Sequence, residues 1–444
     1  MGRTYQKAYD VHRNCFQEID DVESELVWGD LEAVKNPFLS YILPVYRRAD
    51  LLEDTLQSVL HQQSVDFPWD IVIVDNEAVA GNETEQLVRR LANPRILYYR
   101  NKDNIGAAGN YNRCLELARA PWVAMLHGDD LILDDHLREA GRWLRELEGS
   151  KKKTAYIYHR YIEFTDRSKV QLHRPEAAKT TQDYFLMQDE GRCLLTGQSF
   201  GVLTGLFAAL PSFGTIMNRQ IMLEAGGFDD SLGVCEDVII PFRLADRYGV
   251  YMAPKIMGYY RLGNNESVKP ATIRKIYASM VDFREYMYSR VWWGPLWGWI
   301  ARDIRNRDLM NYCIGLSRYN PEPLHAEDFA DIYRPKETKG IKLRLFQFVI
   351  RIFNWKYHLR DYDDRIALLL KLQQKNIQAQ LPKTDSIYLY GAGHVARVLI
   401  PLLKKQYGNR LRGCLVSNVP AGHGDGGLPG TGCDGALLYD AGAV

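Results

Sequence analysis

The hydrophobic positions between residues 38 and 150 follow two alternating patterns. Short segments that are apolar at consecutive positions alternate with longer segments in which apolar residues recur every three or four positions. The first pattern is typical of parallel strands covered by helices on both faces, and the second of amphipathic helices. Their alternation predicts an α/β fold with a doubly wound, mainly parallel sheet flanked by helices. The strands are expected at FLSYILPVY (38–46), DIVIVDN (70–76), RILYY (95–99) and WVAML (122–126).

A helix is expected after each of these strands. Leu52, Leu56 and Val59 fall on one face of the first helix, which can therefore pack on the sheet. Asp50, followed three positions later by Glu53, resembles a capping box and predicts where that helix begins. The remaining helices are expected near residues 82–92, 107–118 and 134–148.

The rest of the chain changes in composition several times. Residues 150–265 are irregular in pattern and rich in aromatic residues and Gly, and they end in a loop that leads into a helix near Glu236. Beyond Val419 there is no Lys or Arg, and Gly is dense. We therefore expect an N-terminal arm (1–36), a main α/β domain (37–270), a helical, aromatic and basic region (271–380), a partial Rossmann-like unit (381–418) and a disordered tail (419–444).

Carboxylates stand where two of the expected strands end. Asp75 follows one apolar strand, and Asp129 and Asp130 follow another. In open α/β sheets, ligands bind beyond the carboxyl ends of the strands. Adjacent carboxylates repel each other, so the Asp129–Asp130 pair favours a shared hard cation such as Mg²⁺ or Mn²⁺. Taken alone, the pair is equally consistent with a solvated turn that caps the next helix.

Two further segments carry candidate chemistry. In the loop DNIGAAGNYN (103–112), Gly106 and Gly109 permit close backbone approach, and the helix start that follows can offer N–H groups to phosphate oxygens. Glu236 and Asp237 could supply a general base that removes a proton from a hydroxyl. Each segment also has a plain structural interpretation, because Gly and acidic residues are common where helices begin.

Charge and composition exclude several classes of protein. The formal net charge is +1, so no overall field attracts nucleic acid. The seven cysteines are scattered without metal-binding spacing and indicate reduced thiols. The N-terminus lacks the apolar segment of a signal peptide, and no run of about 20 apolar residues occurs. These features predict a cytoplasmic protein with no nucleic-acid partner.

The candidate motifs become specific when they are taken in order. The segments PVYRRADLLEDTLQSVLHQQ (44–63), IVIVDN (71–76), NIGAAGNYNRCLELARAPWVAMLHGDD (104–130) and GGFDDSLGVCED (226–237) together resemble a family 2 glycosyltransferase of GT-A fold. The resemblance covers roughly residues 38–265, and would make the α/β domain the catalytic one. It implies an inverting, metal-dependent transfer of a sugar from a UDP-, dTDP- or GDP-sugar to an acceptor hydroxyl.

The resemblance also implies roles for individual residues. Those expected to contact the nucleotide sugar are Pro44, Tyr46, Asp75, Asn104, Gly106, Asp129, Arg261 and Ser267, the last two from the segment YRLGNNESV (260–268). Asp130 would bind a Mn²⁺ or Mg²⁺ ion with Asp129 beside it. Asp237 would be the catalytic base, and Glu236 would support the base or the acceptor.

Departures from the family pattern limit what the resemblance implies. Arg47 stands where relatives often have Asn, and Asn76 where many have a second Asp. The Q-x-x-R-W signature of processive members is absent, which favours the addition of a single sugar. The expected acceptor is a saccharide or a lipid-linked molecule in the assembly of a surface polysaccharide or glycolipid.

The sequence of two downstream regions fits more than one interpretation. Residues near 290–300 and 340–360 interleave Trp, Phe, Leu and Ile with Lys and Arg. Helices of this composition suit peripheral contact with the inner face of a membrane, although packing on the catalytic domain explains them at least as well. Near Gly391 the chain reads like the opening of a Rossmann unit, but Ser417 and Asn418 stand where a ribose-binding acid is expected. No NAD cofactor is therefore expected.

Two rival functions remain open at this point. A metal-dependent nucleotidyltransferase would also use carboxylates at strand ends, but the segment after the first strand has arginines and no Gly-rich phosphate loop. A non-catalytic protein that binds sugar nucleotides as a scaffold could share the same fold. The presence of Asp237 argues against the scaffold.

Overall fold

The computed structural model describes residues 9, 13–176, 186–187, 192–204, 213–263, 266–356, 387–390, 403–404, 408, 411–417 and 436–440. The chain divides into two compact units, residues 1–348 and 349–444. The first unit contains every residue for which the sequence predicts a role in chemistry.

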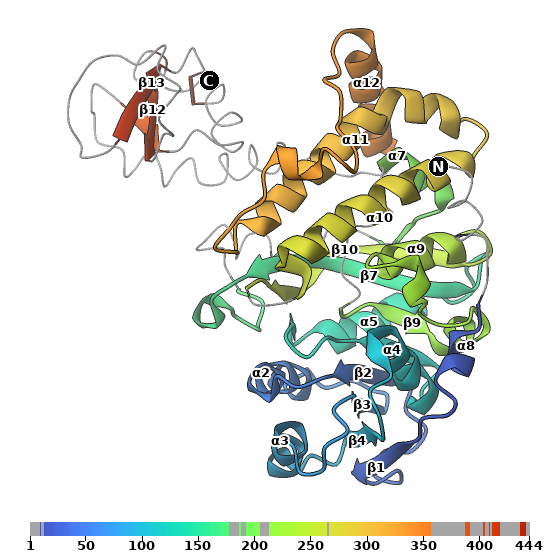
Figure 1. Ribbon diagram of the computed structural model, residues 1–444. Coiled ribbons are helices and arrows are strands. Elements are labelled where there is room, and N and C mark those ends of the chain that lie inside the picture. The colour runs from blue at the N-terminus through green and yellow to red at the C-terminus, as the bar shows by residue number, and fades with distance from the viewer. Residues whose placement is uncertain are drawn as a thin grey trace. The chain divides into compact units, whose positions relative to one another are not determined.

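A mixed sheet forms the centre of the first unit (Figure 1). Among the described residues the strand order is β1-β4-β3-β2-β5-β9-β7-β10-β6, and β8 pairs with β10 beside this path. The strands are β1 (Ser24–Trp28), β2 (Leu39–Val45), β3 (Trp69–Asp75), β4 (Ile96–Asn101), β5 (Trp122–Met125), β6 (Leu131–Ile132), β7 (Thr154–Phe164), β8 (Leu194–Leu195), β9 (Ile216–Asn218) and β10 (Gly249–Arg261).

The part of the sheet that the hydrophobic pattern predicts is parallel. β2 pairs in parallel with both β3 and β5, and β3 pairs in parallel with β4. Val45 lies opposite Asp75, so the carboxyl ends of β2 and β3 meet at one edge. All seven residues of β3 are buried, as its consecutive apolar positions require. The α/β fold class is therefore confirmed.

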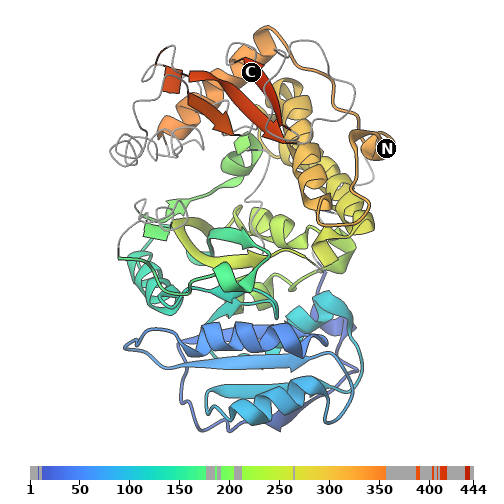
Figure 2. The same ribbon diagram turned by 90° about the vertical axis from the view of Figure 1, so that its left-hand side faces the viewer.

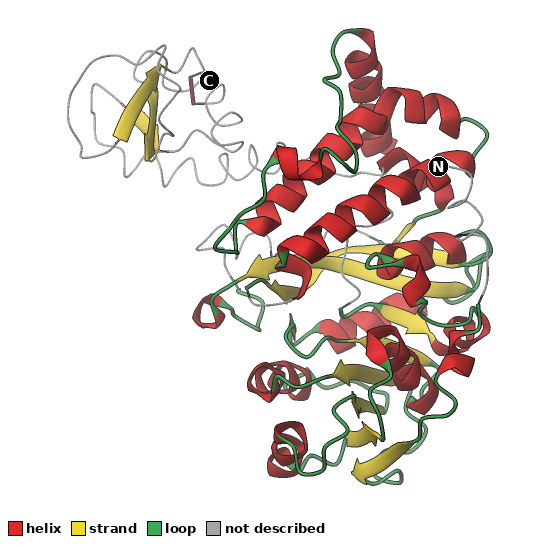
Figure 3. Ribbon diagram, viewed as in Figure 1, coloured by secondary structure: helices red, strands yellow, loops and turns green. Residues whose placement is uncertain are grey.

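Helices cover both faces of this sheet (Figures 1 and 3). Apolar side chains of α2, α3 and α5 join alternate residues of β2, β3 and β4 in one buried cluster. α4 packs against β2 and β3 from the opposite side. The helices are α2 (Ala49–Leu60), α3 (Glu83–Leu91), α4 (Gly106–Leu117), α5 (His136–Glu146), α7 (Gln198–Thr204), α8 (Arg219–Glu224), α9 (Glu236–Leu244), α10 (Pro270–Ser289), α11 (Gly294–Ser317) and α12 (Ile341–Lys356).

The beginning of α2 differs from the expected capping box. The N-cap residue is Arg48, in a left-handed conformation with φ of 63° and no side-chain capping hydrogen bond. Arg47 before it also has a positive φ, of 60°. Asp50 consequently lies within the first turn, where its negative charge still favours the positive end of the helix dipole.

The second half of the sheet was not expected from the sequence. β9 is antiparallel to both β5 and β7, while β7 and β10 are parallel to each other. β7 and β10 are the long strands of this half, with 11 and 13 residues. Their pairing joins segments about a hundred residues apart, and that kind of contact leaves little trace in a local pattern.

Downstream of the sheet, two long helices lie side by side (Figure 2). α10 and α11 form an antiparallel pair, and Trp297 of α11 stacks on Phe346 of α12 with ring centroids 5.5 Å apart. The described part of the region expected to be helical contains α10, α11 and α12. None of the helices in the described ranges has the length and apolar composition needed to cross a membrane.

The second unit is described only in part. β11 (Ile387–Tyr390) pairs in parallel with β12 (Leu411–Ser417), and β12 pairs antiparallel with β13 (Ala436–Asp440). β13 falls in the segment for which the sequence predicts no ordered element. The expected Gly-rich turn and helix after β11, and most of the tail, lie outside the described residues.

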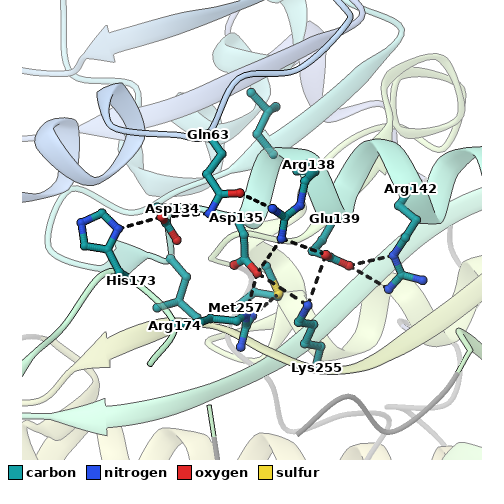
Figure 4. Close-up of polar contacts among 12 residues, drawn as sticks. Gln63, Asp134, Asp135, Arg138, Glu139, Arg142, His173, Arg174, Lys255 and Met257 are labelled. Carbon is teal, nitrogen blue, oxygen red and sulfur yellow. Dashed lines mark hydrogen bonds and ion pairs between the residues drawn. The ribbon is translucent and has the colours of Figure 1, made fainter. Parts of the chain in front are cut away.

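A cluster of charged residues joins α5 to β10 (Figure 4). Asp135 and Glu139 are almost completely buried, and Lys255 Nζ lies 3.6 Å and 3.2 Å from their respective carboxylates. Arg174 Nε donates a 2.5 Å hydrogen bond to Asp135. Because buried charges are stable only when paired, this network fixes the segment around Arg174 against the sheet.

Candidate functional site

A cavity of about 510 Å³ opens at the carboxyl ends of β2 and β5. The beginning of α9 and the segment between β10 and α10 form its other walls. This is the edge at which a parallel sheet is expected to bind ligands. The residues lining the cavity are Pro44, Val45, Tyr46, Arg47, Arg48, Leu52, Tyr111, His127, Gly128, Asp129, Val234, Glu236, Asp237, Tyr260, Glu266, Ser267, Thr272 and Ile276.

On the side of β5, three residues could hold a metal ion. Ligand atoms of His127, Asp129 and Asp130 all lie within 4.8 Å of one another. Asp130 is fully buried, and its Oδ2 lies 3.4 Å from His127 Nδ1. Burial raises the pKa of Asp130 to about 6. Two carboxylates and an imidazole lie close together here, and one of the carboxylates is fully buried, so the donor set fits a bound cation.

Asp130 is held in place by the end of β10. The backbone N–H of Arg261 donates to Asp130 Oδ1 at 2.9 Å, and Arg261 Nε donates to the carbonyl oxygen of Asp129 at 2.7 Å. The Arg261 guanidinium also lies 3.2 Å from Asp54. Arg261 therefore positions the turn that carries the two carboxylates.

On the facing side, Glu236 and Asp237 form the first turn of α9. Both line the cavity, and Asp237 also lines a second cavity next to it. Burial, followed by the neighbouring charge of Asp237, raises the pKa of Glu236 to about 8. Glu236 is therefore largely protonated at neutral pH and can donate a hydrogen bond, which an ionised carboxylate cannot do.

The residues after β2 form a polar and aromatic rim. Pro44 lies in β2, and Tyr46 follows it with 48% of its surface exposed at the cavity. The Arg47 guanidinium lies 5.0 Å from the centroid of the Tyr46 ring and 3.3 Å from Glu77. An exposed aromatic ring beside two arginines, Arg47 and Arg48, suits a planar anionic ligand.

Asp75 lies deeper than its place at the strand end suggests. Its side chain is fully buried and accepts hydrogen bonds from the backbone N–H of Glu77, from Asn82 Nδ2 and from the Tyr98 hydroxyl, at 2.8 to 2.9 Å. Burial raises its pKa. Asp75 is thus satisfied by protein donors in this structure.

An asparagine network shapes the neighbouring loop. Asn76 donates to Asn104 Oδ1 at 2.8 Å and to the carbonyl oxygen of Gly106 at 3.0 Å, and it accepts from Asn101 at 3.0 Å. Only a side chain that both donates and accepts can make this set of bonds, which explains why an amide rather than a carboxylate occupies position 76. Gly106 has a φ of 75°, which favours Gly there.

The cavity therefore brings together part of the predicted set. Of the candidate residues, those that line it are Pro44, Tyr46, Asp129, Glu236, Asp237 and Ser267. Asp130 and Arg261 lie behind Asp129, while Asp75, Asn104 and Gly106 belong to the neighbouring hydrogen-bonded region.

Sequence reasoning assigned no role to His127, Tyr111 or Tyr260. The rings of Tyr111 and His127 are nearly parallel, with centroids 6.1 Å apart, and the Tyr260 hydroxyl shares a 2.8 Å hydrogen bond with Ser267. His127 stands three positions before Asp130, and that spacing was the available signal.

Comparison with known proteins relates part of the chain to a family. Residues 40–203 match the family model described as glycosyl transferase family 2. The uncharacterized protein MT1568 of Mycobacterium tuberculosis is 27% identical over 52% of this chain and 70% of its own length. The succinoglycan biosynthesis protein ExoO of Rhizobium meliloti is 25% identical over 46% of this chain and 55% of its own length. The chain thus spans about half of ExoO.

Among solved structures, S. aureus TarS (residues 1–349) in complex with UDP-GlcNAc is 14% identical. That match covers 66% of this chain and 79% of TarS, with a TM-score of 0.43. The family model agrees with the expectation from the ordered motifs. Residues 40–203 are therefore a domain of the glycosyl transferase family 2 type.

Proposed function

We propose that the protein is an inverting enzyme that transfers one sugar from a nucleotide-diphospho-sugar to an acceptor hydroxyl. One observation carries this proposal: a single cavity has His127 and Asp129 on one wall and Glu236 and Asp237 on the other. A metal-binding wall facing an acid–base wall is the arrangement that a direct displacement needs.

The proposed mechanism assigns the proton to Asp237. Its carboxylate accepts the proton of the acceptor hydroxyl while the hydroxyl oxygen attacks the anomeric carbon from the side opposite the diphosphate. Glu236 beside it is protonated, so the turn does not carry a second negative charge, and its carboxyl group can donate a hydrogen bond to the base or to the acceptor. A single displacement of this kind inverts the anomeric centre.

We propose that His127, Asp129 and Asp130 hold a divalent ion, with Mn²⁺ favoured over Mg²⁺. Carboxylates suit both ions, whereas an imidazole ligand is less suited to the harder Mg²⁺. A bound divalent ion would stabilise the negative charge that grows on the leaving diphosphate. Arg261 keeps Asp129 and Asp130 in position for this task.

The donor is a UDP-, dTDP- or GDP-sugar in this proposal. Tyr46 offers an exposed ring for the base, with Pro44 beside it. Arg47 and Arg48 line the same wall and suit a diphosphate. From the family resemblance we keep three candidate contacts to the donor, Asn104, Gly106 and Ser267. Asp75 is a candidate contact to the nucleoside, but its present hydrogen bonds to the protein would have to rearrange first.

We propose that the acceptor is a saccharide or a lipid-linked molecule in surface polysaccharide or glycolipid assembly, and that the enzyme works in the cytoplasm. The name of the relative ExoO supports the polysaccharide context. Contact with the inner face of the membrane is part of this proposal, because large apolar side chains are exposed on α11 and α12.

The proposal is tested with a panel of nucleotide sugars, each with Mn²⁺, Mg²⁺ or a chelator. We expect one donor to bind and to be hydrolysed slowly, Asp129→Ala to lose metal-dependent binding, and Asp237→Asn to keep binding while losing at least about 100-fold in turnover. Asp166→Asn, a half-buried carboxylate outside the cavity, is the control. Donor binding without turnover in the wild type would favour a scaffold instead, and unchanged turnover in Asp237→Asn would exclude Asp237 as the base.

A further inference from the structure

A second cavity of about 320 Å³ lies next to the first. Five residues line both cavities, namely Val234, Asp237, Tyr260, Ser267 and Ile276. The proposed base is therefore accessible from both sides. The other residues lining the second cavity are Tyr161, Cys235, Val238, Met280, Arg284, Arg305, Asp308, Leu309, Tyr312 and Leu316.

The second cavity runs along the pair of helices α10 and α11. Ile276 near the shared wall and Arg284 at the far end are separated by eight residues of α10, about 12 Å along a helix. Arg284 Nη1 donates to the carbonyl oxygen of Arg305 at 2.8 Å and to Asn306 Oδ1 at 2.6 Å. These bonds brace the two helices, so the cavity is pre-formed.

The walls differ in chemistry from those of the donor cavity. Along the helices they are mostly apolar, with Met280, Leu309 and Leu316 each less than 10% exposed, and the charged residues Arg284, Arg305 and Asp308 line the rest. Near the shared wall stand the tyrosines Tyr161, Tyr260 and Tyr312, whose rings offer an apolar face and a polar hydroxyl. Aromatic rings beside the base and apolar side chains beyond them suit a sugar followed by an apolar group.

We infer that this second cavity is the acceptor subsite and that it binds a glycoside with an apolar aglycone. This inference rests on the proposed function. The acceptor sugar lies among the tyrosines and the aglycone lies between α10 and α11. The hydroxyl oxygen of the acceptor sugar forms a bond to the anomeric carbon of the donor. The bond from that carbon to the diphosphate breaks, and its electron pair leaves with the diphosphate. Asp237 receives the hydroxyl proton.

The order of the elements agrees with this assignment. The second cavity is built largely by residues after position 233, beyond the segment 40–203 that matches the family model. One fold hosts different functions through the sites added to it, so a subsite particular to this chain is expected on elements that the common domain does not provide.

The test uses hexyl and methyl β-glycosides of glucose, galactose, mannose and N-acetylglucosamine as probes. Their binding is measured by saturation-transfer NMR and titration, separately from donor hydrolysis. Each buried methylene strengthens binding about three- to fourfold, so we expect a hexyl glycoside to bind at least about tenfold more tightly than its methyl counterpart. Equal affinities for every pair would overturn the inference.

Two variants connect the preference to this cavity. Met280→Phe fills the space between the helices, and Tyr312→Ser removes a ring that is 43% exposed and therefore can be truncated without loss of the core. We expect each to reduce the hexyl-over-methyl preference about tenfold while donor binding and hydrolysis stay as in the wild type. Tyr319→Ser, a matched tyrosine that is 46% exposed beyond α11, should keep the preference.

The outcomes separate this inference from the proposed function. If hexyl glycosides are preferred and the two cavity variants keep that preference, the apolar subsite lies elsewhere and the inference fails. If no nucleotide sugar is hydrolysed but the preference disappears in both cavity variants, the cavity binds apolar glycosides and the transferase mechanism fails instead.

Discussion

At the scale of single residues, burial gives different properties to neighbouring carboxylates. Asp129 faces the cavity, whereas Asp130 is fully buried behind it with a pKa raised by burial to about 6. Glu236 has a pKa raised to about 8 by burial and lies beside Asp237. Pairs of acids whose environments separate their pKa values can divide acid and base roles between them.

The raised pKa of Asp130 predicts pH-dependent metal binding. A protonated carboxyl does not bind a cation, so Mn²⁺ affinity should fall about tenfold as the pH is lowered from 7 to 5, through the pKa near 6. Titration calorimetry at both pH values measures this. Asp130→Asn should lower the affinity at pH 7 at least about tenfold, whereas Asp134→Asn, a buried acid outside the site, should not. An unchanged affinity in Asp130→Asn would remove Asp130 from the metal site.

The raised pKa of Glu236 predicts a pH-dependent stability. The native state holds the Glu236 proton up to a pKa of about 8, above the ordinary value of 4.5, so it binds more protons than the unfolded state between these values. Stability from this group therefore decreases as the pH rises from about 4.5 to about 8.

The substitution Glu236→Gln removes the ionisable group and therefore this loss of stability at high pH. We expect its melting temperature to exceed that of the wild type by about 5 °C at pH 8 and to match it at pH 5, as measured by calorimetry. Glu266→Gln, in which an exposed acid of the cavity rim is neutralised, is the control. A difference of the same size at pH 5 and pH 8 would contradict the assigned ionisation.

The position of a site residue could be predicted only where its own helix or strand determines it, and not where distant elements surround the side chain. Asp129 and Asp237 stand directly at the ends of elements, and the structure places both at the cavity. The burial of Asp75 depends on donors from Asn82 and Tyr98, which reach it from two other elements. His127 joins the metal-binding group only because the turn after β5 folds it back to within 3.4 Å of Asp130.

At the scale of elements, α12 has an exposed apolar stripe. Ile341, Leu345 and Phe348 are 70%, 39% and 61% exposed and are spaced as one helix face requires. On α11 and just before it, Trp292, Leu296 and Trp299 are 93%, 64% and 54% exposed. Lys342 of α12 lies 4.0 Å from the Trp299 ring centroid, so the two exposed sets are neighbours. α12 contains basic residues and no acidic ones.

This stripe predicts binding to anionic membranes. We expect the protein to sediment with vesicles of phosphatidylcholine and phosphatidylglycerol at 3:1, and much less with phosphatidylcholine alone, because basic and apolar contacts act together. Leu296→Glu with Phe348→Glu should reduce the bound fraction at least about fivefold. Leu31→Glu, which changes an exposed leucine on the N-terminal arm, should not. Binding by the double variant at the wild-type level would exclude this face.

Helices and strands could be predicted where a short window of sequence contains their hydrophobic pattern. The segments from β2 to α5 follow from periodicity, since consecutive apolar positions and helical spacing are both visible within a short window. β9 has three residues, and β7 and β10 mix aromatic, polar and charged positions. Their place in the sheet is decided by partners far away in the chain, which a local pattern does not contain.

At the scale of the whole molecule, the first unit contains a complete set of parts for the proposed reaction. The sheet edge supplies the proposed metal-binding carboxylates, α9 supplies the proposed base, and α10 and α11 supply most of the second cavity. All of these lie within residues 1–348. The residues matched by the family model end at 203, so the proposed base and most of the second cavity are contributed by later segments of the same unit.

The division into two units predicts that the second is dispensable for donor chemistry. A chain that ends after Lys356, the last residue of α12, keeps every residue that lines either cavity. Because a compact unit of this size buries its own core, we expect the shortened chain to melt within about 3 °C of the full chain and to hydrolyse the donor at a rate within about twofold. Calorimetry and a nucleotide-release assay check the two expectations, with a chain ending after Ser317, which lacks α12, as the comparison. Loss of donor hydrolysis in a folded chain ending after Lys356 would mean that the second unit contributes to the donor site.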